Sequence, residues 1–261
     1  MNRILVLLML SAAILAGCKA LPPRVPVLPE RSAGEVYSLL KSRQPDVTTF
    51  QIRGRLTLIS PKQNATGNAI LKAKLPESLR VDLKDPLGRA VLSFATDGQT
   101  MELLFPREGK LFRGAATPAN LAAFIPPGVS LSQALSLLAG KVPLSPAPPE
   151  KLTVDSREGN YLLEWLKGDG SPRERLTVAG HDLRPCREEW YGDQGRLIFA
   201  AELEGFDPQG SGPAKRLRLL TQDPLVELRL AYQEFTPNIS LTPQDLQVPR
   251  PPGVREFPLK P

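Results

Sequence analysis

Three side chains in this sequence suggest covalent, acid–base or metal chemistry, because they are its only thiols and its only imidazole: Cys18, Cys186 and His181. A Ser/His/Asp triad would have to use His181, which stands in a Gly-His-Asp tripeptide typical of a turn between strands. Metal sites favour clustered histidine, cysteine or carboxylate ligands, which are lacking around it. The adjacent Glu188 and Glu189 would face opposite sides of a strand. With no G-x-S-x-G pattern and no glycine-rich phosphate loop, we expect no enzyme, no resident metal and no cofactor.

Cys18 ends an N-terminal apolar run. Arg3 gives a short positive start, residues 4–15 are almost wholly apolar, and the run closes with the sequence Leu-Ala-Gly-Cys. Such a run is shorter than the roughly 20 residues of a membrane-spanning helix and has the organisation of a secretory signal. Its end resembles a bacterial lipobox, which implies cleavage before Cys18 and acylation of the thiol and the new amine. The alternatives are an uncleaved anchor or a chance cysteine.

The residues after Cys18 indicate where the anchor would lie. Two or more acyl chains make a stable anchor. Lys19 is not the aspartate that tends to retain lipoproteins in the inner membrane, so the resemblance implies the periplasmic face of the outer membrane. Residues 21–29 read LPPRVPVLP, typical of a stiff spacer of about 3 Å per residue. We therefore divide the chain into a signal peptide (1–17), a lipidated cysteine with a proline-rich tether (18–31) and one folded domain (32–261).

Charge and cysteine content narrow the classes of partner. The net charge is +6, but no basic cluster is interleaved with aromatic residues, so we expect no nucleic-acid binding. We interpret the charges mainly as solvated faces of strands. With Cys18 committed to lipid, Cys186 has no intramolecular partner, and a buried, inert thiol is expected.

The folded domain shows mostly alternating polarity, which is typical of antiparallel strands with one solvated face. Residues 50–58, 79–84 and 226–233 show it best. Turn sequences separate such segments, at residues 85–88, 97–98, 158–160, 168–170 and 192–195. The pattern predicts a mainly β fold, a single large curved antiparallel sheet of about ten or eleven strands.

Helical patterns are few. Ser32 and Glu35 form a capping box before one amphipathic segment. Thr117 followed by proline predicts a second helix start, and the capping box Ser130–Gln133 predicts a third. We expect these short helices on the concave face of the sheet.

The order of these segments resembles one known family. Residues 50–60 (FQIRGRLTLIS) resemble the first strand of the outer-membrane lipoprotein receptors, the LolB-like proteins. Residues 80–94, which contain a Pro-Leu-Gly tip, resemble that family's hairpin, and residues 125–140 resemble its inserted helix. The strand at residues 69–74 lacks the family's usual aromatic residue. Residues 235–261 resemble instead the ending of the related periplasmic carriers of the LolA type.

The resemblance implies that the sheet forms a half-open antiparallel barrel covered by the helices, with an apolar cavity for the acyl chains of lipoproteins. It also implies a role, which is to accept lipoproteins from a soluble periplasmic carrier and pass them into the phospholipid of the outer membrane. We expect the chain to be a monomer. Each candidate residue for the cavity has ordinary core packing as its alternative. The candidates are Leu56, Leu58, Leu92, Phe94, Leu103, Phe105, Leu121, Phe124, Leu135, Leu138 and Trp165.

The hairpin tip carries a second candidate site. Asp85, Pro86 and Gly88 occupy the favoured positions of a type I turn, which places Leu87 at its tip. In the resembling family this leucine enters the membrane; the alternative is that Leu87 folds back onto the sheet. Two other functions stay open for the whole chain: a carrier or sensor of the same fold for another lipid or glycolipid, and a periplasmic lipid hydrolase.

Overall fold

The computed structural model describes residues 28–61, 64–122, 124–125, 128–207, 212–222 and 225–259. The predicted signal peptide, Cys18 and the tether as far as residue 27 lie outside these residues. Pro29, at the described end of the tether, accepts a hydrogen bond from the hydroxyl of Tyr161. Within the described ranges, no helix is long and apolar enough to cross a membrane.

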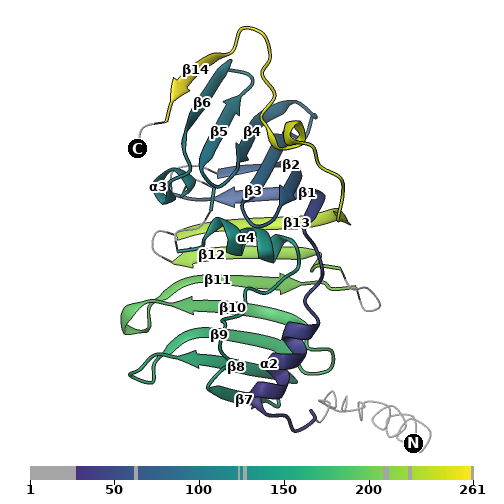
Figure 1. Ribbon diagram of the computed structural model, residues 1–261, viewed down its shortest axis with the longest axis vertical. Helices are drawn as coiled ribbons and strands as arrows, with labels where there is room; N and C mark the ends of the chain where they lie inside the picture. Colours follow the sequence, from purple (N-terminus) through teal and green to yellow (C-terminus); the bar gives the residue numbers. More distant parts are fainter. Residues whose placement is uncertain are drawn as a thin grey trace, which may run out of the picture.

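One large sheet organises the chain. Its strands are β1 (Thr49–Ile59), β2 (Asn64–Lys74), β3 (Ser78–Lys84), β4 (Ala90–Thr96), β5 (Thr100–Phe105), β6 (Lys110–Ala115), β7 (Lys151–Asp155), β8 (Asn160–Leu166), β9 (Pro172–Ala179), β10 (Pro185–Tyr191), β11 (Leu197–Glu204), β12 (Arg216–Gln222), β13 (Leu225–Pro237) and β14 (Arg255–Pro258). They lie in the order β14-β6-β5-β4-β3-β2-β1-β13-β12-β11-β10-β9-β8-β7 (Figure 1). All neighbours are antiparallel except β14 and β6, which are parallel.

The prediction of a single curved sheet is confirmed, but the count of ten or eleven strands is wrong, because the described residues contain fourteen. β14 shows the reason. It has four residues, ends in a proline, and lies in a segment that the sequence presents as a tail. Its strand conformation depends on pairing with β6, more than a hundred residues earlier in the chain, and a local pattern does not reveal such a partner.

The junction between β1 and β13 holds the two halves of the sheet together. Phe50 of β1 faces Pro237 of β13, and Ile59 faces Glu227 at the other end of the pair. A bulge interrupts this register between Arg53 and Gly54. At Gly54 a Cβ atom would lie 2.4 Å from the carbonyl oxygen of Ala231, so only glycine fits there without a shift.

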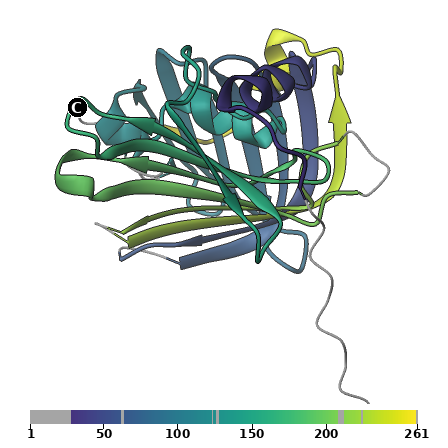
Figure 2. The same cartoon turned by 90° about the horizontal axis from the view of Figure 1, so that it is seen from below.

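The helices start at the predicted caps. They are α2 (Ala33–Ser42), α3 (Pro118–Leu121) and α4 (Leu131–Leu138), with short 3₁₀ turns η1 (Asp193–Gly195) and η2 (Pro243–Leu246). Both predicted capping boxes are present, at Ser32 and Ser130, and Thr117 caps α3. Figure 2 shows the sheet curving around the side on which α2 and α4 lie, which confirms their expected place.

Apolar side chains on the concave, inner face form two separate buried clusters. In the first, α4 packs over β1–β4 and β11–β13. In the second, α2 packs over β8 and β9, where Tyr161, Leu163 and Trp165 are fully buried. A third, smaller cluster lies on the outer face, where Val248 of the C-terminal segment packs against Leu104 and Leu111.

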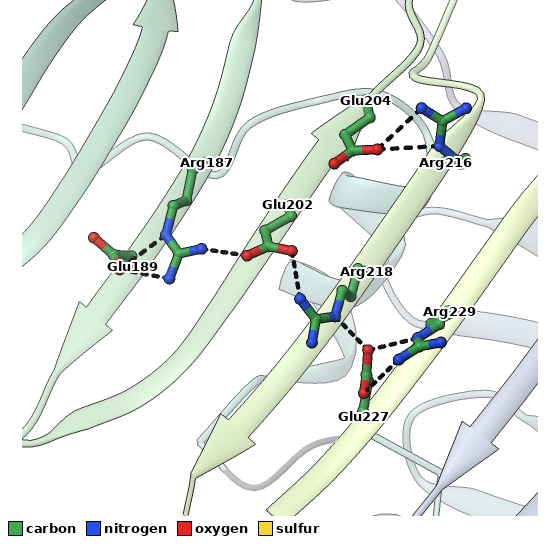
Figure 3. Close-up of polar contacts among 8 residues, drawn as sticks. All are labelled: Arg187, Glu189, Glu202, Glu204, Arg216, Arg218, Glu227 and Arg229. Carbon is green, nitrogen blue, oxygen red and sulfur yellow. Dashed lines mark hydrogen bonds and ion pairs between the residues drawn. The ribbon is translucent and has the colours of Figure 1, made fainter. Parts of the chain in front are cut away.

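The outer face of β10–β13 carries alternating acidic and basic side chains. Glu202 lies between Arg187 and Arg218, and Glu227 lies between Arg218 and Arg229 (Figure 3). These ion pairs link four neighbouring strands. They confirm, for these strands, the interpretation of the charges as a solvated face, so an apolar site over β10–β13 would lie on the inner face.

Candidate functional site

An apolar cavity of about 120 Å³ lies between α4 and the inner face of the sheet. Every side chain around it is hydrophobic, because the strands direct their inward-facing apolar residues into it. The lining residues are Leu56, Leu58, Ala65, Leu71, Leu79, Val81, Leu83, Leu92, Phe94, Phe124, Ile125, Leu131, Ala134, Leu135, Leu138, Leu219, Leu228 and Leu230. Such a site has no group for acid–base or metal chemistry, and its one chemical property is affinity for apolar matter.

The structure brings seven of the eleven cavity candidates to this cavity, and four are placed elsewhere. The seven are Leu56, Leu58, Leu92, Phe94, Phe124, Leu135 and Leu138. Leu103 and Leu121 pack around the same cluster without lining the cavity. Phe105 contacts Phe112 instead, with ring centroids 6.0 Å apart. Trp165 belongs to the cluster beneath α2, and its indole N–H donates to the carbonyl of Ala147.

α4 covers the cavity with its apolar side. Its first turn is fixed by the capping box, in which the amide of Gln133 donates to the Ser130 hydroxyl over 3.1 Å. Its last turn is fixed by the buried hydroxyl of Tyr232, which donates to the carbonyl oxygen of Leu138 over 3.1 Å. Burial raises the pKa of Tyr232, so this donor keeps its proton. Leu135 is fully buried between these two points.

The Asp85–Gly88 turn is rigid, and its tip is exposed. The amide of Gly88 donates to the carbonyl oxygen of Asp85 over 2.9 Å, as the predicted turn requires. The Asp85 carboxylate accepts from the amides of Leu87 and Arg89 and also from the guanidinium group of Arg107. Leu87 itself is 76% exposed, so the alternative that it folds back onto the sheet is wrong.

The charge of Asp85 is stable in this turn. Desolvation acts to raise its pKa, but the hydrogen bonds from Arg89 and Arg107 outweigh it and lower the pKa to about 2. The carboxylate is therefore ionised at any physiological pH. The hydrogen bonds that the Asp85 carboxylate accepts thus fix the conformation of the turn that carries Leu87.

The other reactive side chains do not assemble into a site. His181 is 73% exposed on the predicted turn, where it lies 3.2 Å from Asp182. Cys186 is half-buried, and burial raises the pKa of its thiol, which keeps it in the unreactive form. Within the described ranges, no three histidine, cysteine or carboxylate side chains lie close enough to hold a metal ion.

The burial of two carboxyl groups was not predicted from the sequence. Glu174 on β9 and Glu188 on β10 are both fully buried on the inner face. Ser145, in the segment after α4, donates to Glu174, and the indole of Trp190 donates to Glu188 over 2.7 Å. A signal did exist, because Glu174 alternates in phase with the inward-facing Leu176.

No protein-family model and no curated sequence matches this chain. Solved structures do. A LolA superfamily protein from Nitrosomonas europaea aligns with a TM-score of 0.52 and 15% identity over 84% of this chain and 99% of that one. A putative outer membrane lipoprotein-sorting protein domain from Vibrio parahaemolyticus gives a TM-score of 0.53 and 12% identity over 82% and 97%. A DUF1329 family protein from Desulfovibrio piger ATCC 29098 aligns with a TM-score of 0.55 and 12% identity over 82% of this chain and 98% of that one. The chain has the LolA/LolB-like fold.

Proposed function

We propose that this chain is a lipoprotein, anchored by Cys18 on the periplasmic face of the outer membrane, that receives the acyl chains of other lipoproteins in the cavity under α4 and passes them into that membrane. The observation that carries the proposal is the wholly apolar cavity of about 120 Å³ between the sheet and a short helix. Exposing one long acyl chain to water costs on the order of 10 kcal/mol, at roughly 0.8 kcal/mol per methylene. A protein that moves such chains needs an apolar site of this kind.

The size of the cavity implies that α4 moves when cargo binds. An engineered cavity of about 150 Å³ holds one benzene molecule, so about 120 Å³ is too small for a long acyl chain. α4 has eight residues, and a hydrogen bond from Tyr232 ties it to β13. Displacement of α4 would widen the cavity along the half-buried Leu58, Leu92 and Leu228, which already line it, and make room for the chain.

The exposed Leu87 supports a release step at the membrane. Full burial of a leucine side chain is worth roughly 1.5 to 3 kcal/mol, and Leu87 makes little use of it in the folded protein. Insertion of the rigid tip into phospholipid would recover this free energy and bring the neighbouring cavity close to the bilayer. The partners we propose are a soluble periplasmic carrier, cargo lipoproteins and outer-membrane phospholipid, and we propose that the chain acts as a monomer.

Transfer of this kind breaks no covalent bond, so we propose no enzymatic activity and no cofactor. A lipid hydrolase would need His181, and a His181→Ala variant with full activity in the assays below would remove that alternative. A carrier or sensor of another lipid is the remaining one. Extraction and mass spectrometry of lipids that copurify with the chain would show acylated lipopeptide if the proposal is right and another lipid or glycolipid if it is wrong.

Cavity binding can be tested with one pair of adjacent residues. Leu58 lines the cavity, whereas Ile59, also half-buried, faces the outer side. We expect Leu58→Gln to weaken binding of a triacylated lipopeptide roughly tenfold or more, since a polar amide would meet the acyl chain. Ile59→Gln should bind as the wild type. Equal affinities in both variants would contradict the proposed cavity.

The release step has a test of its own. We expect Leu87→Glu to leave the melting temperature and lipopeptide affinity unchanged but to slow transfer of lipopeptide into liposomes. Val154→Glu, a change at another exposed apolar residue on β7, is the control and should transfer normally. Normal transfer by Leu87→Glu would reject the insertion step.

A further inference from the structure

Three phenylalanine rings on neighbouring strands contact one another near one edge of the sheet. Phe105 of β5 and Phe112 of β6 have centroids 6.0 Å apart, and Phe112 and Phe257 of β14 stack at 5.5 Å. All three are half-buried. Among the described residues they belong to none of the three buried clusters. They form a separate, half-buried aromatic group at this edge of the sheet.

These rings continue the lining of the cavity. In the strand registers Val81 faces Phe94, Phe94 faces Leu103, Leu103 faces Phe112, and Phe112 faces Phe257. The first two residues line the cavity. Because directly paired residues share a face, the five form one apolar row across β3, β4, β5, β6 and β14 on the inner side. Four strand spacings give the row a length of about 19 Å.

Two basic residues stand beside the row at the outer edge of the sheet. Lys110 faces Phe105 on one side and Arg255 on the other. The guanidinium carbon of Arg255 lies 5.9 Å from the centre of the Phe257 ring. Lys110 pairs with Glu108 over 2.8 Å, whereas no carboxylate within the described ranges pairs with Arg255. An apolar row that ends at cations is complementary to a lipid with an anionic head group.

We propose that this row binds one anionic phospholipid. Its phosphate lies at Arg255 and Lys110, and an acyl chain runs along Phe257, Phe112 and Leu103 toward the cavity. Arginine suits phosphate because its planar guanidinium group donates two parallel hydrogen bonds. This site goes beyond the proposed function, since it holds a membrane lipid rather than cargo. It also gives β14 a role, because that strand supplies both the charge and the last ring.

Alternation along β14 provides matched variants. Arg255 and Phe257 face inward, whereas Glu256 faces outward and lies 3.7 Å from Arg250. Arg255→Gln and Phe257→Ser change the proposed site. Glu256→Gln and Arg250→Gln change the charge of the same region on the opposite face and serve as controls.

The experiment measures binding of fluorescent phosphatidylglycerol, phosphatidylcholine and palmitate to the full chain. We expect the wild type to prefer phosphatidylglycerol. Arg255→Gln should weaken phosphatidylglycerol binding about fivefold, the usual worth of one basic residue at an anionic lipid, and leave phosphatidylcholine unchanged. Phe257→Ser should weaken both phospholipids, and both controls should bind as the wild type.

Three results would overturn the proposal: wild-type phosphatidylglycerol affinity in Arg255→Gln, equal binding of both phospholipids by the wild type, or tighter binding of palmitate, which would assign the site to a free fatty acid. Photolabelling of the wild-type chain with an azido-phosphatidylglycerol gives a second readout, which does not depend on whether Phe257→Ser folds. The proposal requires the label to attach to residues of β6 and β14. Lipopeptide affinity in Leu58→Gln tests the cargo cavity separately. Either site can therefore fail while the other stands.

Discussion

The free energy of unfolding of the wild type should fall as the pH rises, because Glu188 is buried. Replacing Glu188 by glutamine should remove much of this fall. Glu188 is fully buried between the two inner clusters. One oxygen accepts from Trp190, while the other has no hydrogen-bond partner among the described residues. Ionisation would place an uncompensated charge in this apolar surrounding, which is costly.

The pKa of Glu188 sets the size of the effect. Burial raises it from 4.5 to about 8; the hydrogen bond from Trp190 opposes the rise, and the nearby Glu174 adds to it. At about 1.4 kcal/mol per pH unit, the difference corresponds to about 5 kcal/mol, which is an upper bound because local opening would admit water. Burial raises the pKa of Glu174 in the same direction, to about 7.

The direction follows from proton linkage. Below pH 4.5 both the folded and the unfolded chain hold the proton, and the carboxyl group costs nothing. Between pH 4.5 and about 8 the unfolded chain releases the proton while the folded chain keeps it, so the free energy of unfolding falls as the pH rises. Above about pH 8 both states are ionised, and the loss is complete.

Urea unfolding of Glu188→Gln between pH 4.5 and 9 measures this. Glutamine keeps the acceptor for Trp190 and never ionises, so the variant should match the wild type near pH 4.5 and exceed it by up to about 5 kcal/mol at pH 8.5. Glu174 still titrates, so some slope should remain. Glu189→Gln, on the outer face beside Arg187, is the control and should keep the wild-type slope. An unchanged slope in Glu188→Gln would refute the reasoning.

Three further changes have defined outcomes. Cys18→Ala should abolish incorporation of labelled fatty acid and leave an unprocessed precursor; label retained on the variant would reject the anchor. Gly54→Ala should cost about 1–3 kcal/mol in urea unfolding, because its Cβ would meet the carbonyl oxygen of Ala231; wild-type stability would mean that the bulge adjusts freely. Ser130→Ala removes the cap of α4, worth about 1 kcal/mol, and should speed uptake of a fluorescent fatty acid in stopped flow; an unchanged rate would show that α4 does not limit entry.

Local signals in the sequence predicted most individual elements. Alternation predicted β1, β3 and β13, and the predicted turns at residues 85–88, 97–98 and 168–170 each separate two strands. The capping boxes at Ser32 and Ser130 predicted two helix starts. Each of these features depends on residues within a few positions of one another, which is why the sequence alone reveals it.

Features that depend on distant partners were predicted less well. Trp165 of β8 faces inward, as a cavity candidate should, but the sequence does not tell that α2, rather than α4, covers that part of the sheet. Phe105 likewise faces inward but meets β6 and β14 instead of the cavity. Which strand lies under which helix is set by long-range pairing, and a periodic pattern carries no such information.

The junction of β1 and β13 affects how the chain folds without aggregating. β1 is among the first strands of the domain, and its partner lies almost at the other end of the chain. Leu56 and Leu58 face Leu230 and Leu228 across this junction, so the cavity wall exists only after β13 has docked. Until then the first half of the sheet has an unpaired edge and an uncovered apolar face. Non-local pairing of this kind is slow, and the unpaired intermediate is prone to aggregation. A chain that emerges N-terminus first should therefore need protection from aggregation until residue 237 has emerged and β13 can pair with β1.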